Sequence, residues 1–319
     1  MRKALLGAPR NTSWLIATGA LTNVALLFSA FPEVASWIKG LSIMGGAIGG
    51  GLTDAPISKM PGEQDRVGNI TPWAEFNIHC DPESAHSIFS NPALASKTTL
   101  IPLDLTHQVL ATPPILARLL PSQQQSPQAP STQQANVSTS SPTSTSIRAR
   151  NLRPLFHDLL TYFASTYARV FGISAGPPLH DPLAVAVVLA DHPDPEYRIW
   201  FSDESSARDA EVSTRWHIDV VTAGDTGEIS HNNMLGRTVA KPITRRPSTS
   251  SPLAPGNGGN PLDNDPVVDS LGLRSNVPSS PNGVGGGVRI MRAVDVEKFW
   301  TVILEGSVVR AEEALGPSR

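Results

Sequence analysis

The strongest concentration of reactive side chains lies in the segment 68–86, GNITPWAEFNIHCDPESAH. It contains one carboxylate and two carboxamides, those of Glu75, Asn69 and Asn77. Glu75 and Asn77 are two positions apart, so an extended or tightly turned backbone directs them to the same side. Each hydroxyl of a polyhydroxylated ligand needs a donor and an acceptor, and these side chains supply both. The segment therefore has the outline of a sugar-binding signature.

The same segment also has a purely structural interpretation. It can be a polar loop that leads into a helix, with Asp81 as the N-cap and Pro82 at the first helical position. The rules for helix starts, taken alone, favour this second interpretation. Both interpretations stay open on composition.

A second compact motif is Leu-His-Asp-Pro at 179–182. An apolar helix is predicted to begin there, with Asp181 at its N-cap and His180 just outside it. Asp104 and His107 also follow a predicted buried strand. A strand-to-helix turn explains both residues as well as a functional role does. The adjacent pair His79-Cys80 has no further ligands nearby in the sequence, which makes it a poor zinc signal.

Short apolar runs predict the strands that must position these motifs. They lie at 13–18, 41–44 and 98–103, and helical patterns separate the first two. This alternation predicts an α/β fold with a largely parallel sheet. Ligands of such sheets bind at the carboxyl ends of the strands, so we expect Thr18 and Met44 to border a binding site.

Between these elements lie segments of biased composition. The glycine-rich segment 45–67 is expected to loop over the mouth of the site, and it lacks the spacing and the lysine of a phosphate loop. Runs of Ser, Thr, Gln, Pro, Asn and Gly predict disordered insertions at 121–150 and 242–287, because they bury too little apolar surface to offset their ordering entropy.

Composition excludes several classes of function. A net charge of -3 in 319 residues gives no electrostatic reason to expect nucleic acid or an anionic membrane as a partner. A single cysteine, Cys80, excludes an internal disulfide framework. The first residues contain no signal-peptide core, and no apolar run approaches the roughly 18 residues of a membrane span. We therefore expect a cytoplasmic protein.

Five segments, in order along the chain, resemble the inosine-uridine preferring nucleoside hydrolases in a fungal-type version. They are ATGALTN (17–23), IMGG (43–46), GNITPWAEFNIHCDPESAH (68–86), PLDLTHQVLAT (102–112) and HDPLAVA (180–186). The resemblance implies a single nucleoside-hydrolase-like domain over 1–319, with a mixed, largely parallel sheet flanked by helices. It also implies hydrolysis of the N-glycosidic bond of ribonucleosides to ribose and free base, in purine and pyrimidine salvage.

The resemblance also implies roles for individual residues. Ca²⁺, a hard cation that prefers oxygen ligands, would be bound by the Thr18 carbonyl and the Asp181 carboxylate. His180 would stand where the family places its proton donor to the leaving base. The ribose would be held by Met44, Asn69, Glu75 and Asn77, in a pocket shaped by Phe76. The partner implied is a small-molecule ribonucleoside, and homo-oligomerisation is left open.

One part of the family pattern is absent from this sequence. The family carries an aspartate cluster of the type DxDxxxDD on its first strand, and this sequence has no acidic residue before Glu33. One carboxylate and one carbonyl fall short of the six to eight oxygens that Ca²⁺ takes. Three interpretations remain: an incomplete piece of an active hydrolase, which we favour; a paralogue that binds ribosides without turnover; and a structural or interaction protein on the same fold.

Overall fold

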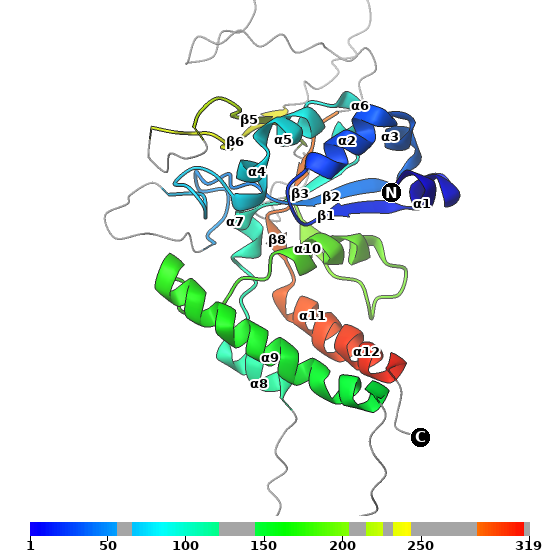
Figure 1. Ribbon diagram of the computed structural model, residues 1–319, viewed down its shortest axis with the longest axis vertical. Coiled ribbons are helices and arrows are strands. Elements are labelled where there is room, and N and C mark those ends of the chain that lie inside the picture. Colours follow the sequence, from blue (N-terminus) through cyan, green and yellow to red (C-terminus); the bar gives the residue numbers. More distant parts are fainter. Residues whose placement is uncertain (56–65, 121–143, 204–214, 226–231, 244–285, 316–319) are drawn as a thin grey trace, which may run out of the picture.

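The computed structural model describes residues 1–55, 66–120, 144–203, 215–225, 232–243 and 286–315. At its centre lies a sheet of four parallel strands in the order β1, β2, β3 and β7 (Figure 1). Their bounds are Trp14–Ala17, Gly40–Met44, Thr98–Ile101 and Arg289–Ile290. Every residue of β2 and β3 is buried, as expected of parallel strands with helices on both faces. The predicted α/β architecture is confirmed.

Helices cover both faces of the sheet (Figure 1). One layer consists of α2 (Thr22–Ala30), α3 (Glu33–Trp37), α5 (Pro82–Phe89) and α6 (Pro92–Ala95). The other contains α10 (Asp181–Ala186), the 3-10 helix η1 (Val187–Asp191) and α11 (Val296–Thr301). Ile43 packs into the first layer and Met44 into the second, because successive side chains of a strand point to opposite faces.

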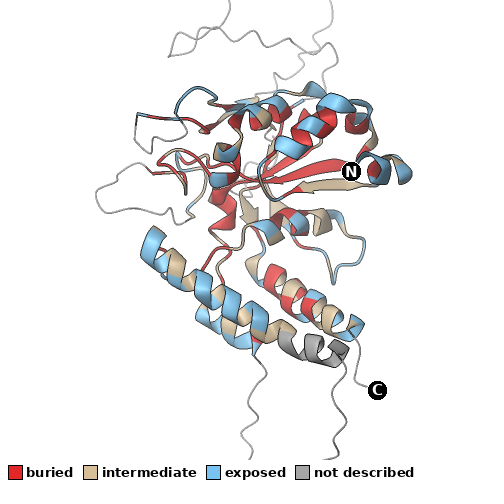
Figure 2. Cartoon of the chain, in the orientation of Figure 1, coloured by how far each residue is buried: buried red, intermediate tan, exposed pale blue. Residues whose placement is uncertain are grey.

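The remaining elements flank this core. Helices α1 (Arg2–Gly7), α4 (Phe76–Cys80) and α7 (Leu103–Thr106) are short, whereas α8 (Pro113–Leu119) and α9 (Ser144–Phe171) pack together away from the sheet. The chain described ends with the π-helix η2 (Val302–Val308) and α12 (Val309–Ala314), which contacts α9. Two separate antiparallel pairs are β5 (Arg215–Val220) with β6 (Thr238–Ile243) and β4 (Phe201–Ser202) with β8 (Ala293–Val294). Figure 2 shows that buried residues concentrate in the central strands and that much of α9 is exposed.

The structure differs from the sequence expectations at several boundaries. Helix α9 begins at Ser144, inside the predicted insertion 121–150, and β6 reaches Ile243, inside the predicted insertion 242–287. The parts 121–143 and 244–285 of those insertions lie outside the described residues. At the start of α10, His180 is the N-cap and Asp181 the first helical residue, so the helix begins one position earlier than predicted. A capping side chain was expected there, but the cap bonds of α10 are made by backbone groups alone.

Within the described ranges, no helix combines the length and the apolar character that a membrane crossing requires. The cytoplasmic location expected from the sequence stays a prediction.

The second helical layer is tied to the sheet by a buried hydrogen bond. The Ser42 hydroxyl, in the middle of β2, donates to the Ala184 carbonyl of α10 over 2.7 Å. The Ser42 side chain is fully buried. This bond fixes α10 under the strand whose end borders the site described below.

We expect Ser42→Ala to lower the free energy of unfolding by about 1–2 kcal/mol, because it leaves a buried carbonyl without this donor. Urea denaturation measures the change. The matched control is Ser36→Ala, which removes an exposed hydroxyl bonded to the Glu33 carbonyl and should change the free energy of unfolding by less than about 0.5 kcal/mol. Equal losses in the two variants would contradict the role of the Ser42 bond.

Candidate functional site

The carboxyl ends of β1, β2 and β3 meet along one edge of the sheet. Ala17 pairs with Ile43 and Met44 pairs with Ile101, so Thr18, which follows β1, lies at the same edge as Met44. Both residues are therefore placed where the alternation of strands and helices predicted. Thr18 is exposed and Met44 is buried.

Glu75 is the buried carboxylate of this edge, with 2% of its surface exposed. Its side chain is the N-cap of α4 and accepts backbone N–H groups from Asn77 at 3.0 Å and Ile78 at 3.1 Å. It also accepts the N–H of Gly46, at 3.0 Å, from the loop that follows β2. One carboxylate thus starts a helix and ties it to the end of a strand, which satisfies three backbone donors at once.

The environment of Glu75 opposes its ionisation. Burial raises the pKa of Glu75, the three backbone N–H groups act in the opposite direction, and the negative charge of Asp181 raises the pKa further. Burial raises the pKa of Asp181 as well. The charge of Asp181 thus reaches Glu75 although the two residues are far apart in the sequence.

Asn77 points to the same stretch of backbone as Glu75. Its Nδ2 donates to the Met44 carbonyl at 3.1 Å and lies 3.2 Å from the Met44 sulfur. The expected convergence of Glu75 and Asn77 is therefore present. Of the two backbones that the sequence allowed, extended or tightly turned, the structure has a turn: Glu75 is the extended N-cap and Asn77 lies in the first turn of α4.

Asn69 and Phe76 are neighbours in space. The Asn69 Oδ1 accepts the backbone N–H of Phe76 at 2.9 Å, which closes the segment 69–76 into a loop. Phe76 itself is half-exposed, with 53% of its surface accessible. The structural interpretation of this segment is confirmed, since Asp81 caps α5 by accepting the N–H of Ser84 at 3.0 Å, with Pro82 at the first helical position. The sugar-binding interpretation stays a prediction.

His180 is held between two hydroxyl groups. Its Nδ1 lies 2.8 Å from the Thr106 hydroxyl and its Nε2 lies 2.7 Å from the Tyr167 hydroxyl. Each hydroxyl can donate or accept, so both neutral tautomers of the imidazole find partners. Burial, and to a lesser degree the charge of His107, lowers the pKa of His180 to about 3. The imidazole is therefore neutral and oriented at both nitrogens.

Sequence reasoning missed the residues around His180. Burial, with the charges of Glu75 and Asp181, raises the pKa of Tyr167 to about 12, so this phenol keeps its proton. Tyr167 sits in a long helix where an aromatic residue is explained by packing periodicity alone. His107, which the sequence explained by a strand-to-helix turn, is buried, with its ring centroid 5.6 Å from that of His180.

The oxygen ligands expected for Ca²⁺ are few. Asp181 is the first residue of α10 and is exposed, and α10 packs against β1, the strand that Thr18 follows. Among the residues that the structure describes, no three of His, Cys, Asp and Glu gather into a group that could hold a metal ion. The donors found, one carboxylate and one carbonyl, do not fit Ca²⁺ by themselves, because that ion takes six to eight oxygens.

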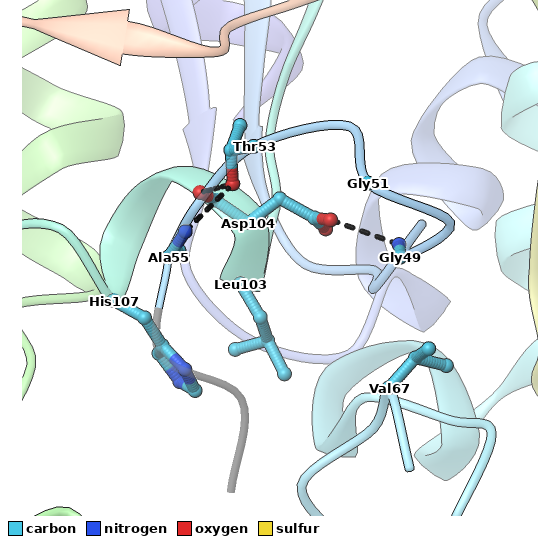
Figure 3. A pocket seen from close by; sticks show the side chains of 8 residues that line it. All are labelled: Gly49, Gly51, Thr53, Ala55, Val67, Leu103, Asp104 and His107. Atoms are coloured by element: carbon cyan, nitrogen blue, oxygen red, sulfur yellow. Dashed lines mark hydrogen bonds between the residues drawn. The ribbon is translucent and has the colours of Figure 1, made fainter. Parts of the chain in front are cut away.

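His107 also lines a small pocket (Figure 3). The glycine-rich loop after β2 forms one wall and α7 forms another. The lining residues are Gly49, Gly51, Thr53, Ala55, Val67, Leu103, Asp104 and His107. None of the residues expected to hold a ribose lines this pocket.

The fold and the site together define a class of α/β protein with buried polar side chains at the carboxyl edge of a parallel sheet. Residues 1–301 match the family described as inosine-uridine preferring nucleoside hydrolase, and the chain belongs to this family. Its members are nucleoside hydrolases, which cleave N-glycosyl bonds. The predicted family membership is confirmed.

Curated relatives match about half of the chain. An uncharacterized protein of Schizosaccharomyces pombe is 34% identical over 175 residues, which cover 55% of this chain and 40% of that protein. The uridine nucleosidase of Saccharomyces cerevisiae is 31% identical over 176 residues, which cover 54% of this chain and 40% of the relative. The aligned part of the chain thus spans 40% of the length of these relatives.

Solved structures show the same fold. A purine-preferring ribonucleoside hydrolase from Gardnerella vaginalis superposes with a TM-score of 0.51 at 20% identity, over 94% of this chain and 63% of that one. A plant nucleoside hydrolase superposes with a TM-score of 0.52 at 20% identity, over 95% and 64% of the two chains.

The depressed pKa of His180 predicts a pH dependence of stability. The unfolded chain binds more protons than the folded chain between about pH 6.5 and about pH 3, so the free energy of unfolding falls as the pH falls through this window. As the pH falls through this window, the free energy of unfolding of the wild type should decrease by up to roughly 1.4 kcal/mol per pH unit relative to that of His180→Asn. Urea unfolding of both proteins at about pH 7.5 and about pH 5 measures this difference. A constant difference between them would show that His180 titrates normally.

Proposed function

We propose that this chain supplies the ribose-binding and leaving-group side of a nucleoside hydrolase site. In the whole protein, that site hydrolyses the N-glycosidic bond of a ribonucleoside to ribose and free base, a reaction of purine and pyrimidine salvage. The observation that carries the proposal is the convergence of Glu75 and Asn77 on the backbone of residues 44–46, at the sheet edge shared with Asp181.

The polar groups at this edge suit the chemistry of glycosidic cleavage. Breaking the bond builds positive charge on the sugar ring, as in other glycoside hydrolyses. The Glu75 carboxylate and the carbonyls at the end of β2 present negative potential that does not need to reorganise, because backbone hydrogen bonds already fix them. Such preorganised groups stabilise the charged transition state more than the neutral substrate.

The ribose contacts are assigned to five residues. Asn69, Glu75 and Asn77 provide hydroxyl partners, Met44 lies beneath them, and the half-exposed Phe76 shapes the rim of the pocket. His180 is assigned to the leaving base. Its two hydroxyl partners, Thr106 and Tyr167, hold the neutral imidazole in place, and the Tyr167 hydroxyl, which keeps its proton, can donate a hydrogen bond to Nε2.

The proposal assigns only two residues to the metal ion. Thr18 and Asp181 would contribute two oxygen atoms to a calcium site, and a complete site would need at least four more. Because the described donors do not fit the ion by themselves, no step of the reaction is derived through it. Base preference is also left broad, since the relatives include both a uridine nucleosidase and a purine-preferring hydrolase.

A second candidate function is binding of ribosides without turnover. It is favoured by the shortage of metal ligands among the described residues, whereas Glu75 and Asn77, assigned to the ribose, converge at the sheet edge. The two functions share one pocket and differ in whether base is released. Incubating the purified chain with inosine and with uridine, with and without added Ca²⁺, separates them by the appearance of free base.

The ribose pocket itself is tested by binding. We expect calorimetry with uridine to give a measurable Kd for the wild type, and a Kd at least about tenfold higher for Glu75→Gln and for Asn77→Ala, since each loses hydrogen bonds worth 1 kcal/mol or more. Glu83→Gln, an exposed carboxylate on α5, is the matched control and should bind like the wild type. If the wild type does not bind uridine at millimolar concentration, the proposal is wrong.

The assignment of His180 is tested in a preparation that releases base. His180→Asn should lower the rate of base release by a factor of about 10² to 10⁴, the usual size of a general acid contribution, and leave the ribose Kd unchanged. Tyr167→Phe keeps the aromatic ring and removes only its hydroxyl, so we expect a smaller decrease in the rate of base release. A His180→Asn protein with weaker ribose binding and an unchanged rate would assign His180 to the sugar instead.

A further inference from the structure

The loop that follows β2 is built largely from glycine. Its positive φ angles are 81°, 67°, 63° and 78° at Gly46, Gly49, Gly50 and Gly51. Glycine adopts this left-handed conformation without steric cost, but it also gives the backbone more freedom than any other residue. The conformation of the loop must therefore be set by groups outside it.

Helix α7 provides most of those groups. The two carboxylate oxygens of Asp104 accept the backbone N–H of Ile48 at 2.9 Å and that of Gly49 at 2.8 Å. The Asp104 carbonyl accepts the hydroxyl of Thr53 at 2.6 Å. Figure 3 shows the Asp104 side chain reaching across to the loop backbone at Gly49, with Thr53 on its other side. One residue thus holds the loop at three points.

The same loop is bonded to the ribose-binding carboxylate. The Gly46 N–H donates to Glu75 at 3.0 Å, and the Gly46 carbonyl accepts the N–H of Leu103 at 2.9 Å. The Gly46 residue is consequently held between Glu75 and α7. Two positions later along the loop, the contacts of Asp104 begin.

A second set of contacts anchors α7 itself. The Gln108 Nε2 donates to the carbonyls of Asp104 and Arg292, each at 2.8 Å. The Arg292 guanidinium donates to the Leu52 carbonyl at 2.9 and 3.2 Å, which returns to the loop. These contacts run from Asp104 through Gln108 and Arg292 to Leu52. The Leu52 N–H donates to the Gly49 carbonyl at 3.1 Å, and the Gly49 N–H donates to Asp104.

We propose that Asp104 is a positioning residue for the ribose site: it fixes the loop so that the Gly46 N–H stays directed at Glu75. Only a carboxylate suits the position, because two consecutive N–H groups need two acceptor oxygens. An asparagine would turn an amide N–H₂ toward one of these donors. The inference rests on the proposed ribose-binding function.

Riboside affinity provides the first test, on the full chain with uridine as the probe. Asp104→Ala should raise the Kd by about tenfold and Asp104→Asn by a smaller factor, since one acceptor remains. The matched control is Asp295→Ala, which also deletes a carboxylate that accepts a backbone N–H, that of Lys298 at 2.9 Å, but at the start of α11. The control should lose comparable stability in urea and keep the wild-type Kd.

Amide hydrogen exchange provides the second test and does not require a ligand. In Asp104→Asn and Asp104→Ala, the Gly46 N–H should exchange at least about tenfold faster than in the wild type, together with those of Ile48 and Gly49. In Asp295→Ala these three amides should exchange at wild-type rates. Unchanged Gly46 exchange in both Asp104 variants would overturn the proposal.

The two tests fail independently. If wild-type uridine binding is absent, the proposed function falls, and Gly46 exchange still decides whether Asp104 positions the loop. If the wild type binds uridine and Gly46 exchange rises without a change in Kd, the loop is anchored by Asp104 but the ribose site does not depend on it, which also overturns the inference.

Discussion

The site depends on one buried carboxylate, that of Glu75. A carboxyl group removed from water is stable only where hydrogen bonds replace its hydration. Here three backbone N–H groups do so, two from the start of α4 and one from Gly46. The same bonds join the segment 69–77 to the end of β2. The hydrogen bonds that Glu75 needs in order to be buried therefore also fix the geometry of the site.

The parallel sheet explains why distant segments contribute to this pocket. With β1, β2 and β3 in register, their carboxyl ends lie along one edge, and each strand delivers the residues that follow it to that edge. Thr18 follows β1, the glycine loop follows β2, and α7 follows β3. Helix α10, tied to β2 through the Ser42 hydroxyl, adds His180 and Asp181.

The site has two halves with different degrees of completeness. On the proposed ribose half, the described residues are hydrogen-bonded to one another before any ligand is present. On the proposed metal half, Thr18 and Asp181 are the two ligands assigned among the described residues, and the aligned region spans 40% of the curated relatives. The halves differ because the proposed ribose contacts come from the segment 69–77 and the end of β2, whereas a calcium site draws oxygens from many segments.

Local pattern in the sequence was sufficient for the strands, for the convergence of Glu75 and Asn77, and for the cap at Asp81, because each depends on residues a few positions apart. It also carried the family resemblance through five short motifs in order. It placed Asp181 one position off in α10, and it extended the predicted insertion past Ser144, where α9 already begins.

Only the tertiary structure identified Tyr167 as a partner of His180 and Asp104 as the residue that holds the glycine loop. Both contacts join elements whose sequence patterns are fully explained by their own helices. Tyr167 continues an aromatic and aliphatic periodicity, and Asp104 looks like an ordinary residue of a strand-to-helix turn. A hydrogen bond between separate elements leaves no mark on either local pattern, so its existence is decided by how the chain packs.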